Sequence, residues 1–433
     1  MMPHRNFSGV KNISKMIDFR LKRQFSVSEG LSKALRSNHT RPLPTGHTKP
    51  NSRWQTLAIA LLVTITGITS DPASATNTEC QSLLRKRDLA SAQSICNQEL
   101  VAQQAAARNG KKTELEALAR AHDNLGSLYM LRREHREAEA QYRASLAARQ
   151  KAFGRNHHLQ AISMLPLAEA LTLQSKTAEA ESLLLKALAL RQSSLGSHSE
   201  AAAQTHHALG VFYTRTNASK AESSFRKEIT ILERLYPSGS PATAIAYNNL
   251  GILRQRAGQT DQAESYYRSA VRMLERTTPN DKRKLTGPLL NLATVLTEKK
   301  QYTAAKPLLL QLLNIRKQLQ GPNAVAVADI HNRLGILHSR TGAMELAEAE
   351  LRKALTVREN SLGSNHLLVA ESCTNLGIFL MHRNRLKEAL PLLRHAAAVT
   401  HSQTGPQSTQ TATAWTNLEQ LYGRLIQEAT ARN

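Results

Sequence analysis

A repeat with a period of 42 residues is the feature that most constrains what this chain can fold into. It is marked by eight anchor leucines, most of them followed by glycine or alanine: Leu125, Leu167, Leu209, Leu250, Leu292, Leu334, Leu376 and Leu418. The spacing is 42 residues throughout, except for one step of 41 between Leu209 and Leu250. An alanine follows each of the first seven anchors twelve or thirteen residues later. A constant period of this length indicates stacked copies of one supersecondary unit.

Each unit has the apolar spacing of two helices. In the first unit, Leu118 and Leu125 belong to one stripe at helical spacing, and Ala138 and Tyr142 belong to a second stripe. Small residues at the anchors allow two antiparallel helices to approach closely. Glycine or proline separates the units, and these residues end helices. The sequence therefore predicts an all-α fold built from helical hairpins.

The motif His122-x-x-Leu125-Gly126-x-x-Tyr129 resembles the tetratricopeptide repeat, with His where that family often has Trp. The last unit restores the Trp, at Trp415. The 42-residue period and connectors such as LGSHSEAAA resemble the kinesin light chain type of this repeat. The resemblance implies an all-α, right-handed α-solenoid of tetratricopeptide-type helical hairpins. A HEAT or armadillo array has a similar period and is the structural alternative.

The domain organisation follows from these boundaries. Residues 1–53 form a basic leader that we expect to be disordered, and residues 54–75 carry an apolar segment with a cleavage site. We expect a short N-terminal capping hairpin over 76–112. A solenoid of seven hairpins plus a C-terminal capping helix then fills 113–433.

The apolar segment predicts export. Trp54 to Ser70 carries no charge, and Ala73-Ser74-Ala75 follows it. A basic flank, a short apolar run and an A-x-A site are the three parts of a secretory signal peptide. We therefore expect cleavage near Ala75 and a periplasmic, secreted or organelle-lumen protein. The alternative is that Trp54 to Ser70 stays uncleaved as a single-pass membrane anchor. The basic leader of 53 residues is unusually long for a simple secretory signal.

The chain has three cysteines, too few for a disulfide framework, and no C-x-x-C spacing. Cys80 and Cys96 lie on the two helices of the capping hairpin. In an oxidising compartment a disulfide between them would stabilise this terminal hairpin. The alternative is two reduced core cysteines.

The sequence contains no phosphate-binding loop, metalloprotease or dinucleotide motif, so we expect no enzyme, no cofactor and no small-molecule substrate. Histidines such as His122, His206 and His331 hold equivalent positions in repeats that are not neighbours. Helices pack on the order of 10 Å apart, so these rings cannot share a metal that needs bonds near 2 Å. We expect no metal site.

Asparagine recurs directly before the anchor leucine. Five of the eight positions are Asn, with Arg at a sixth: Asn124, Asn249, Asn291, Arg333, Asn375 and Asn417. Asparagine is a poor helix former, but its amide can both donate to and accept from a peptide backbone. By resemblance, this position lines the concave groove of tetratricopeptide proteins and holds an extended peptide. The alternative is that these side chains bond neighbouring repeats or water.

Six residues after the anchor, arginine is frequent, at Arg215, Arg256, Arg340 and Arg424. Guanidinium groups suit carboxylates, so an acidic segment is a natural ligand. The first two repeats have leucine at this position, and the second also has Pro166 where asparagine would stand. We therefore expect repeats three to eight to form the binding stretch. The predicted function is a non-catalytic scaffold that binds a protein or peptide.

The net charge supports an alternative function. The chain has 57 basic and 33 acidic residues, and the part beyond residue 75 keeps 46 against 30, a charge of +16. Nucleic acid or an anionic surface could bind such a solenoid. Export and the lack of interleaved aromatic residues disfavour nucleic acid.

Overall fold

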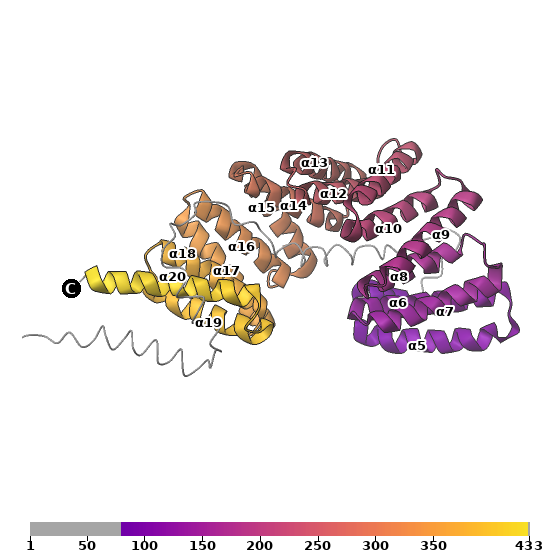
Figure 1. The fold of residues 1–433 in the computed structure, drawn as a ribbon, viewed down its shortest axis with the longest axis horizontal. Helices are drawn as coiled ribbons and strands as arrows, with labels where there is room; N and C mark the ends of the chain where they lie inside the picture. Colours follow the sequence, from indigo (N-terminus) through magenta and orange to yellow (C-terminus); the bar gives the residue numbers. More distant parts are fainter. Residues whose placement is uncertain (1–78, 432–433) are drawn as a thin grey trace, which may run out of the picture. The chain divides into compact units, whose positions relative to one another are not determined.

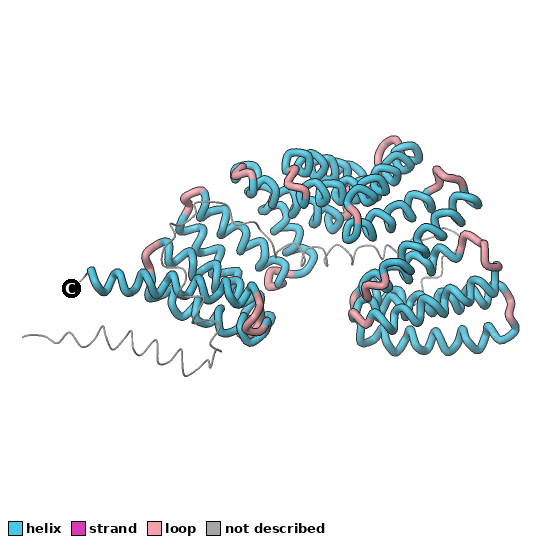
Figure 2. The backbone as a smooth tube through the Cα atoms, in the orientation of Figure 1, coloured by secondary structure: helices cyan, strands magenta, loops and turns pink. Residues whose placement is uncertain are grey.

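The computed structural model describes residues 79–431, and all regular structure in that part of the chain is helical (Figures 1 and 2). The helices, numbered as in Figure 1, are α4 (Glu79–Lys86), α5 (Leu89–Ala106), α6 (Lys112–Arg132), α7 (His135–Phe153), α8 (Gln160–Leu173), α9 (Thr177–Leu195), α10 (Glu200–Thr216), α11 (Ala218–Leu235), α12 (Pro241–Arg256), α13 (Thr260–Thr277), α14 (Thr286–Glu298), α15 (Tyr302–Gln320), α16 (Val325–Arg340), α17 (Met344–Leu362), α18 (Leu367–His382), α19 (Leu386–Thr404) and α20 (Thr409–Ala431). Two short 3₁₀ turns, Ala107–Asn109 and Lys282–Leu285, precede α6 and α14. The predicted all-α solenoid of helical hairpins is confirmed.

Each repeat is one hairpin. The first helix, which carries the anchor leucine, is called the A helix (α6, α8, α10, α12, α14, α16, α18 and α20), and its partner the B helix (α7, α9, α11, α13, α15, α17 and α19). Each A helix packs against its own B helix, and each B helix packs against the next A helix. The core therefore continues from one hairpin to the next along the chain, as a repeat stack requires.

Close helix crossings explain the small residue after the anchor. A Cβ atom placed on Gly126 would lie 2.7 Å from the Tyr142 ring, and one on Gly251 would lie 2.5 Å from the Tyr267 ring. Both rings are almost fully buried. Glycine thus lets a large B-helix side chain lie directly on the A-helix backbone, as the sequence pattern predicted.

Glycine also ends most of the B helices. Gly154 follows α7 with φ of +84°, and Gly321 follows α15 with the same value. This left-handed conformation carries little cost for glycine and stops the helix. The predicted connectors therefore lie at the observed hairpin boundaries.

The N-terminal end of the described stack is the hairpin α4–α5. Asp88 caps α5 by accepting a hydrogen bond from the Ser91 amide at 3.1 Å. Cys80 and Cys96 are fully buried and joined by a disulfide, with their Cα atoms 5.0 Å apart. At the C-terminal end, α20 is an A helix without a B helix.

The predicted leader (1–53) and the predicted export segment (54–75) lie outside the described residues. No helix within residues 79–431 combines the length and apolarity needed to span a bilayer.

Candidate functional site

One surface of the A helices collects most of the predicted binding residues. A helix turns roughly 100° per residue, so positions two before, one before, two after and six after the anchor leucine point away from the anchor. The anchors themselves are buried in the hairpin core. We call the surface formed by these four positions of all A helices the A face.

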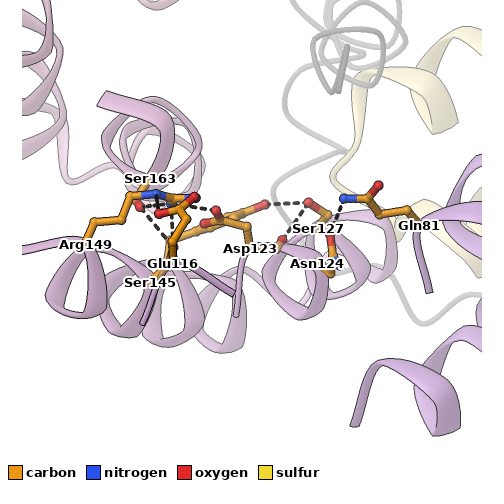
Figure 3. Close-up of polar contacts among 9 residues, drawn as sticks. Gln81, Glu116, Asp123, Asn124, Ser127, Ser145, Arg149 and Ser163 are labelled. Atoms are coloured by element: carbon orange, nitrogen blue, oxygen red, sulfur yellow. Dashed lines mark hydrogen bonds and ion pairs between the residues drawn. The ribbon is translucent and has the colours of Figure 1, made fainter. Parts of the chain in front are cut away.

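Two of the predicted asparagines on the A face bond the preceding repeat. Asn291 Nδ2 in α14 donates to Asn248 Oδ1 in α12 at 2.9 Å. Gln81 Nε2 in α4 donates to Asn124 Oδ1 in α6 at 3.2 Å, as Figure 3 shows. In both cases a residue one before its anchor bonds the residue 43 positions earlier in the chain. That earlier residue occupies the position two before the anchor in the preceding repeat. These amides stabilise the stack, which is the alternative role that the sequence left open.

The same pair of positions is open between α16 and α18. Asn332 corresponds to Asn248 and Asn375 to Asn291, yet the Oδ1 atom of Asn332 and the Nδ2 atom of Asn375 have no hydrogen-bond partner among the described residues. Asn332 is only 3% exposed, and Asn375 is half-buried. An unpaired buried amide atom costs about 1–3 kcal/mol. This pair is therefore the least satisfied polar feature of the predicted site.

The other residues before the anchors differ in their surroundings. Asn249 is buried in α12 and Asn417 is half-buried in α20. Arg333 lies on α16, where its Nε donates to Asp329 Oδ2 at 3.2 Å and its Nη1 to Thr294 Oγ1 at 3.3 Å. Arg333 therefore bridges to α14 and contributes to the stack.

The arginines six residues after the anchors are exposed, as a binding surface requires. Two of them also bond the preceding A helix: Arg256 Nη1 donates to the Thr214 carbonyl at 3.3 Å, and Arg424 Nη1 donates to the Met381 carbonyl at 2.9 Å. These carbonyls lie in the last turns of α10 and α18, where a positive charge is favourable. Arg215 and Arg340 donate no hydrogen bond within residues 79–431.

Sequence reasoning missed a column of arginines inside the stack. Four B helices carry Arg 24 residues after the anchor: Arg149, Arg191, Arg316 and Arg358. Three of them donate to a carbonyl in the first turn of the next A helix, for example Arg358 Nη1 to the Leu368 carbonyl at 2.9 Å. Their constant offset from the anchor was the signal that could have identified them.

Arg149 is the most enclosed member of this column, with 1% exposure. Its Nη2 lies 3.0 Å from Glu116 Oε1 and its Nη1 lies 2.7 Å from Asp123 Oδ2 (Figure 3). Its Nη1 also donates to Ser145 Oγ at 2.9 Å and to Ser163 Oγ in the next A helix at 2.5 Å. The guanidinium charge is compensated within the protein by two carboxylates and two hydroxyls, so Arg149 is structural.

Arg191 occupies the same repeat position as Arg149 but bonds uncharged oxygens instead of carboxylates. It donates to the Ala201 carbonyl at 2.9 Å and to Thr205 Oγ1 at 3.0 Å. None of the described carboxylates pairs with it, and burial lowers its pKa to about 10. Neutral oxygens thus hold this guanidinium in the stack.

A second feature that the sequence did not reveal lies between α8, α10 and α11. His207 Nδ1 lies 3.0 Å and 3.1 Å from the two carboxylate oxygens of Glu228, which is 3% exposed. Glu169, on the A face of α8, is half-buried and has no hydrogen bond or ion pair within the described residues. Burial raises the pKa of Glu169 to about 7, although the His207 charge opposes the shift.

Two of the histidines at the tryptophan position of the repeat bond a side chain within their own hairpins. His122 Nδ1 and Gln141 Oε1 lie 2.7 Å apart, and His331 bonds Glu350 in the same way. The connector residue His366 caps α18 by accepting from the Leu368 amide at 3.1 Å. Within residues 79–431, no three metal-ligating side chains gather into a metal site.

Comparisons with known proteins agree with this architecture. Tetratricopeptide repeat models match residues 117–193, 164–234, 202–276, 286–360 and 369–402, which is more than half of the chain. No curated protein matches the chain in sequence.

Similar solved structures share little sequence identity with the chain. The apo form of the quorum sensor NprR from B. thuringiensis is 12% identical, with a TM-score of 0.51, covering 90% of this chain and 95% of that one. A signal transduction ATPase with a tetratricopeptide repeat sensor, PH0952 from Pyrococcus horikoshii, is 16% identical with a TM-score of 0.50, covering 74% and 44%. Repeats described as those of a Podosopora anserina kinesin light chain are 18% identical with a TM-score of 0.43, covering 48% and 99%.

At these identities the structural likenesses show the fold alone, whereas the repeat models show the family. Repeats of this kind are typically non-catalytic, and the matches indicate a protein-interaction scaffold for this chain. By its repeated helical hairpins and by the models that match them, this chain belongs to the tetratricopeptide repeat family.

Proposed function

We propose that the protein is a scaffold that holds an extended segment of a partner protein on the A face of the sixth and seventh repeats. Asn332 and Asn375 would bond the backbone of that segment. The observation that carries this proposal is the unsatisfied amide pair between α16 and α18, whose two atoms are buried and would have to turn toward the A face to meet a partner segment.

The chemistry of the open pair matches a peptide backbone. The Oδ1 atom of Asn332 can accept a hydrogen bond, and the Nδ2 atom of Asn375 can donate one. A peptide offers an N–H and a C=O at every residue other than proline. An extended segment would therefore satisfy both atoms without any requirement for a particular side chain, and would recover the free energy that the open pair costs.

The neighbouring charge favours an acidic partner. Arg340 ends α16, is exposed, and donates no hydrogen bond within the described residues. It lies six residues after Leu334 and so belongs to the same surface as Asn332. A guanidinium with unused donors can bind a carboxylate in two-pronged geometry.

A display library of short random peptides, selected on the purified full chain, tests the proposal. The affinity of a selected peptide is then measured by calorimetry for the natural protein, Asn375→Ala and Asn291→Ala. Loss of one neutral hydrogen bond should weaken binding about three- to tenfold in Asn375→Ala. Asn291→Ala should bind like the natural protein, because Asn291 already bonds Asn248.

Two outcomes would overturn the proposal. The library could yield no binder, or the selected peptides could bind Asn375→Ala and the natural protein equally. Thermal melting of each variant shows whether it is folded, so a folding defect cannot be taken for lost binding.

We also propose that the protein is exported, with cleavage near Ala75. The buried disulfide between Cys80 and Cys96 supports this proposal, because such bonds persist in oxidising compartments. N-terminal sequencing of the protein from its native compartment, together with non-reducing mass spectrometry, tests it. A mature chain that retains residues 54–75, or free thiols at both cysteines, would contradict it.

A further inference from the structure

We infer that Glu169, together with the ion-paired His207 and Glu228, forms a second subsite on the A face that binds a lysine or arginine side chain of the partner. The inference rests on the proposed peptide-binding function. It concerns the second and third repeats, outside the stretch that the sequence analysis favoured.

The position of Glu169 distinguishes it from its equivalents. It lies two residues after the anchor Leu167, on the A face. The residues at this position in the other A helices are uncharged: Ser127, Val211, Ile252, Thr294, Ile336, Ile378 and Gln420. Glu169 is therefore the one carboxylate in a neutral column, in a repeat region with a net charge of +16.

Glu169 forms no hydrogen bond or ion pair within the described residues, and the nearby His207 charge acts on it only from a distance. His207, two residues before Leu209, also lies on the A face, but its Nδ1 bonds the buried Glu228 carboxylate. One imidazolium can neutralise only one of the two glutamates. With His207 and Glu228 paired, Glu169 has no ion-pair partner of its own within the described residues, and it is half-buried and so still accessible to a cation that would favour its ionised form.

Protonation equilibria agree with this description. The pKa of Glu169 is raised to about 7 because burial desolvates the carboxylate and too little positive charge compensates it. Burial alone would lower the pKa of His207, but Glu228 and then Glu169 raise it above its usual value. A cation placed beside Glu169 would supply the positive charge that the carboxylate lacks.

A partner side chain fits this subsite better than a metal ion does. The residues within 79–431 form no cluster of three metal ligands. An ammonium or guanidinium group needs only one carboxylate and can be delivered by a segment that lies along the A face. Glu169 would then bind the cationic side chain while the asparagines bind backbone.

The same display library separates this inference from the proposed function. It is selected in parallel on the natural full chain, on Glu169→Gln, and on Glu275→Gln, and the selected peptides are sequenced. Glu275 is an exposed glutamate on the B helix α13 and serves as the matched control. Lysine and arginine should be enriched at one position about fivefold on the natural chain and on Glu275→Gln, and not on Glu169→Gln.

The inference fails if Glu169→Gln selects the same cationic peptides, or if the natural chain selects peptides without a cationic preference. In both cases peptides are still selected, so the proposed function survives. If no protein variant selects any peptide, the proposed function fails and this subsite with it. Glu169→Asp, which keeps the charge, should restore part of the enrichment.

Discussion

Two contacts between successive A helices place asparagine at the same two repeat positions. One joins α12 to α14, and the other joins α16 to α18. In the first, Asn291 donates to Asn248 and both amides help to hold successive repeats together. In the second, Asn332 and Asn375 leave an acceptor and a donor unsatisfied. Identical residues thus form a hydrogen bond at one junction and leave two buried amide atoms without a partner at the other.

The same contrast applies to the charged residues. Arg149 is buried with two carboxylates and two hydroxyls around it, so its charge is compensated within the protein. Glu169 is half-buried and uncompensated. A closed polar cluster should matter for stability, and an open one should matter for binding.

Arg149→Met should destabilise the protein most. Removing one partner of a buried ion pair typically costs about 3–5 kcal/mol, because the remaining charges are left uncompensated. Here Glu116 and Asp123 would lose their partner. Urea unfolding measures the change, and Arg136→Met, at an exposed position of α7, is the control. A cost below about 1 kcal/mol would show that the closed cluster does not stabilise the stack.

Glu169→Gln should stabilise the protein at high pH. The folded state raises the pKa of Glu169 from 4.5 to about 7, so folding takes up a proton and the free energy of unfolding falls as the pH rises between these values. Glu169→Gln cannot ionise at this position, so its free energy of unfolding should not fall for this reason as the pH rises. It should match the natural protein near pH 4.5 and exceed it by about 3 kcal/mol at pH 8.

Urea unfolding across this pH range checks the difference. His207 and Tyr142 face Glu169 from α10 and α7, Glu228 in α11 bonds His207, and all three are present in both proteins. Subtracting the two curves therefore isolates most of the contribution of Glu169. Equal stability at pH 8 would mean that the Glu169 carboxylate is compensated after all.

The two asparagine variants should differ by a smaller amount. Asn291→Ala leaves Asn248 Oδ1 without its donor and should cost about 1–2 kcal/mol. Asn375→Ala removes a donor that already lacks a partner, so stability should stay within about 0.5 kcal/mol. Calorimetric melting of the two variants compares them. Equal destabilisation would remove the distinction between closed and open pairs.

The sequence was sufficient to predict the hairpins because the anchor leucines and the glycines after the B helices repeat with a constant period. Close packing at Gly126 and Gly251 followed from the same pattern. The binding residues were harder to predict. Whether Asn291 or Asn375 is free depends on the orientation of another amide 43 residues earlier, and both have asparagine there. Only the folded structure distinguishes the two.

Other features were missed for a different physical reason. Arg149 and Glu169 have charged side chains, which usually lie in solvent, and their burial depends on neighbours in the next repeat. The arginine column could have been found from its constant offset. The Glu169 cluster could not, because Glu169, His207 and Glu228 occur together in only one pair of repeats.

The side-chain amide signals of asparagine test the central claim most directly. The full chain is labelled with ¹⁵N at asparagine, and the signals are assigned from spectra of the single alanine variants. On addition of a selected peptide, the signals of Asn332 and Asn375 should shift, while those of Asn248 and Asn291 stay in place. Shifts of Asn248 and Asn291 alone, or no shift of Asn332 and Asn375 at saturating peptide, would contradict the account.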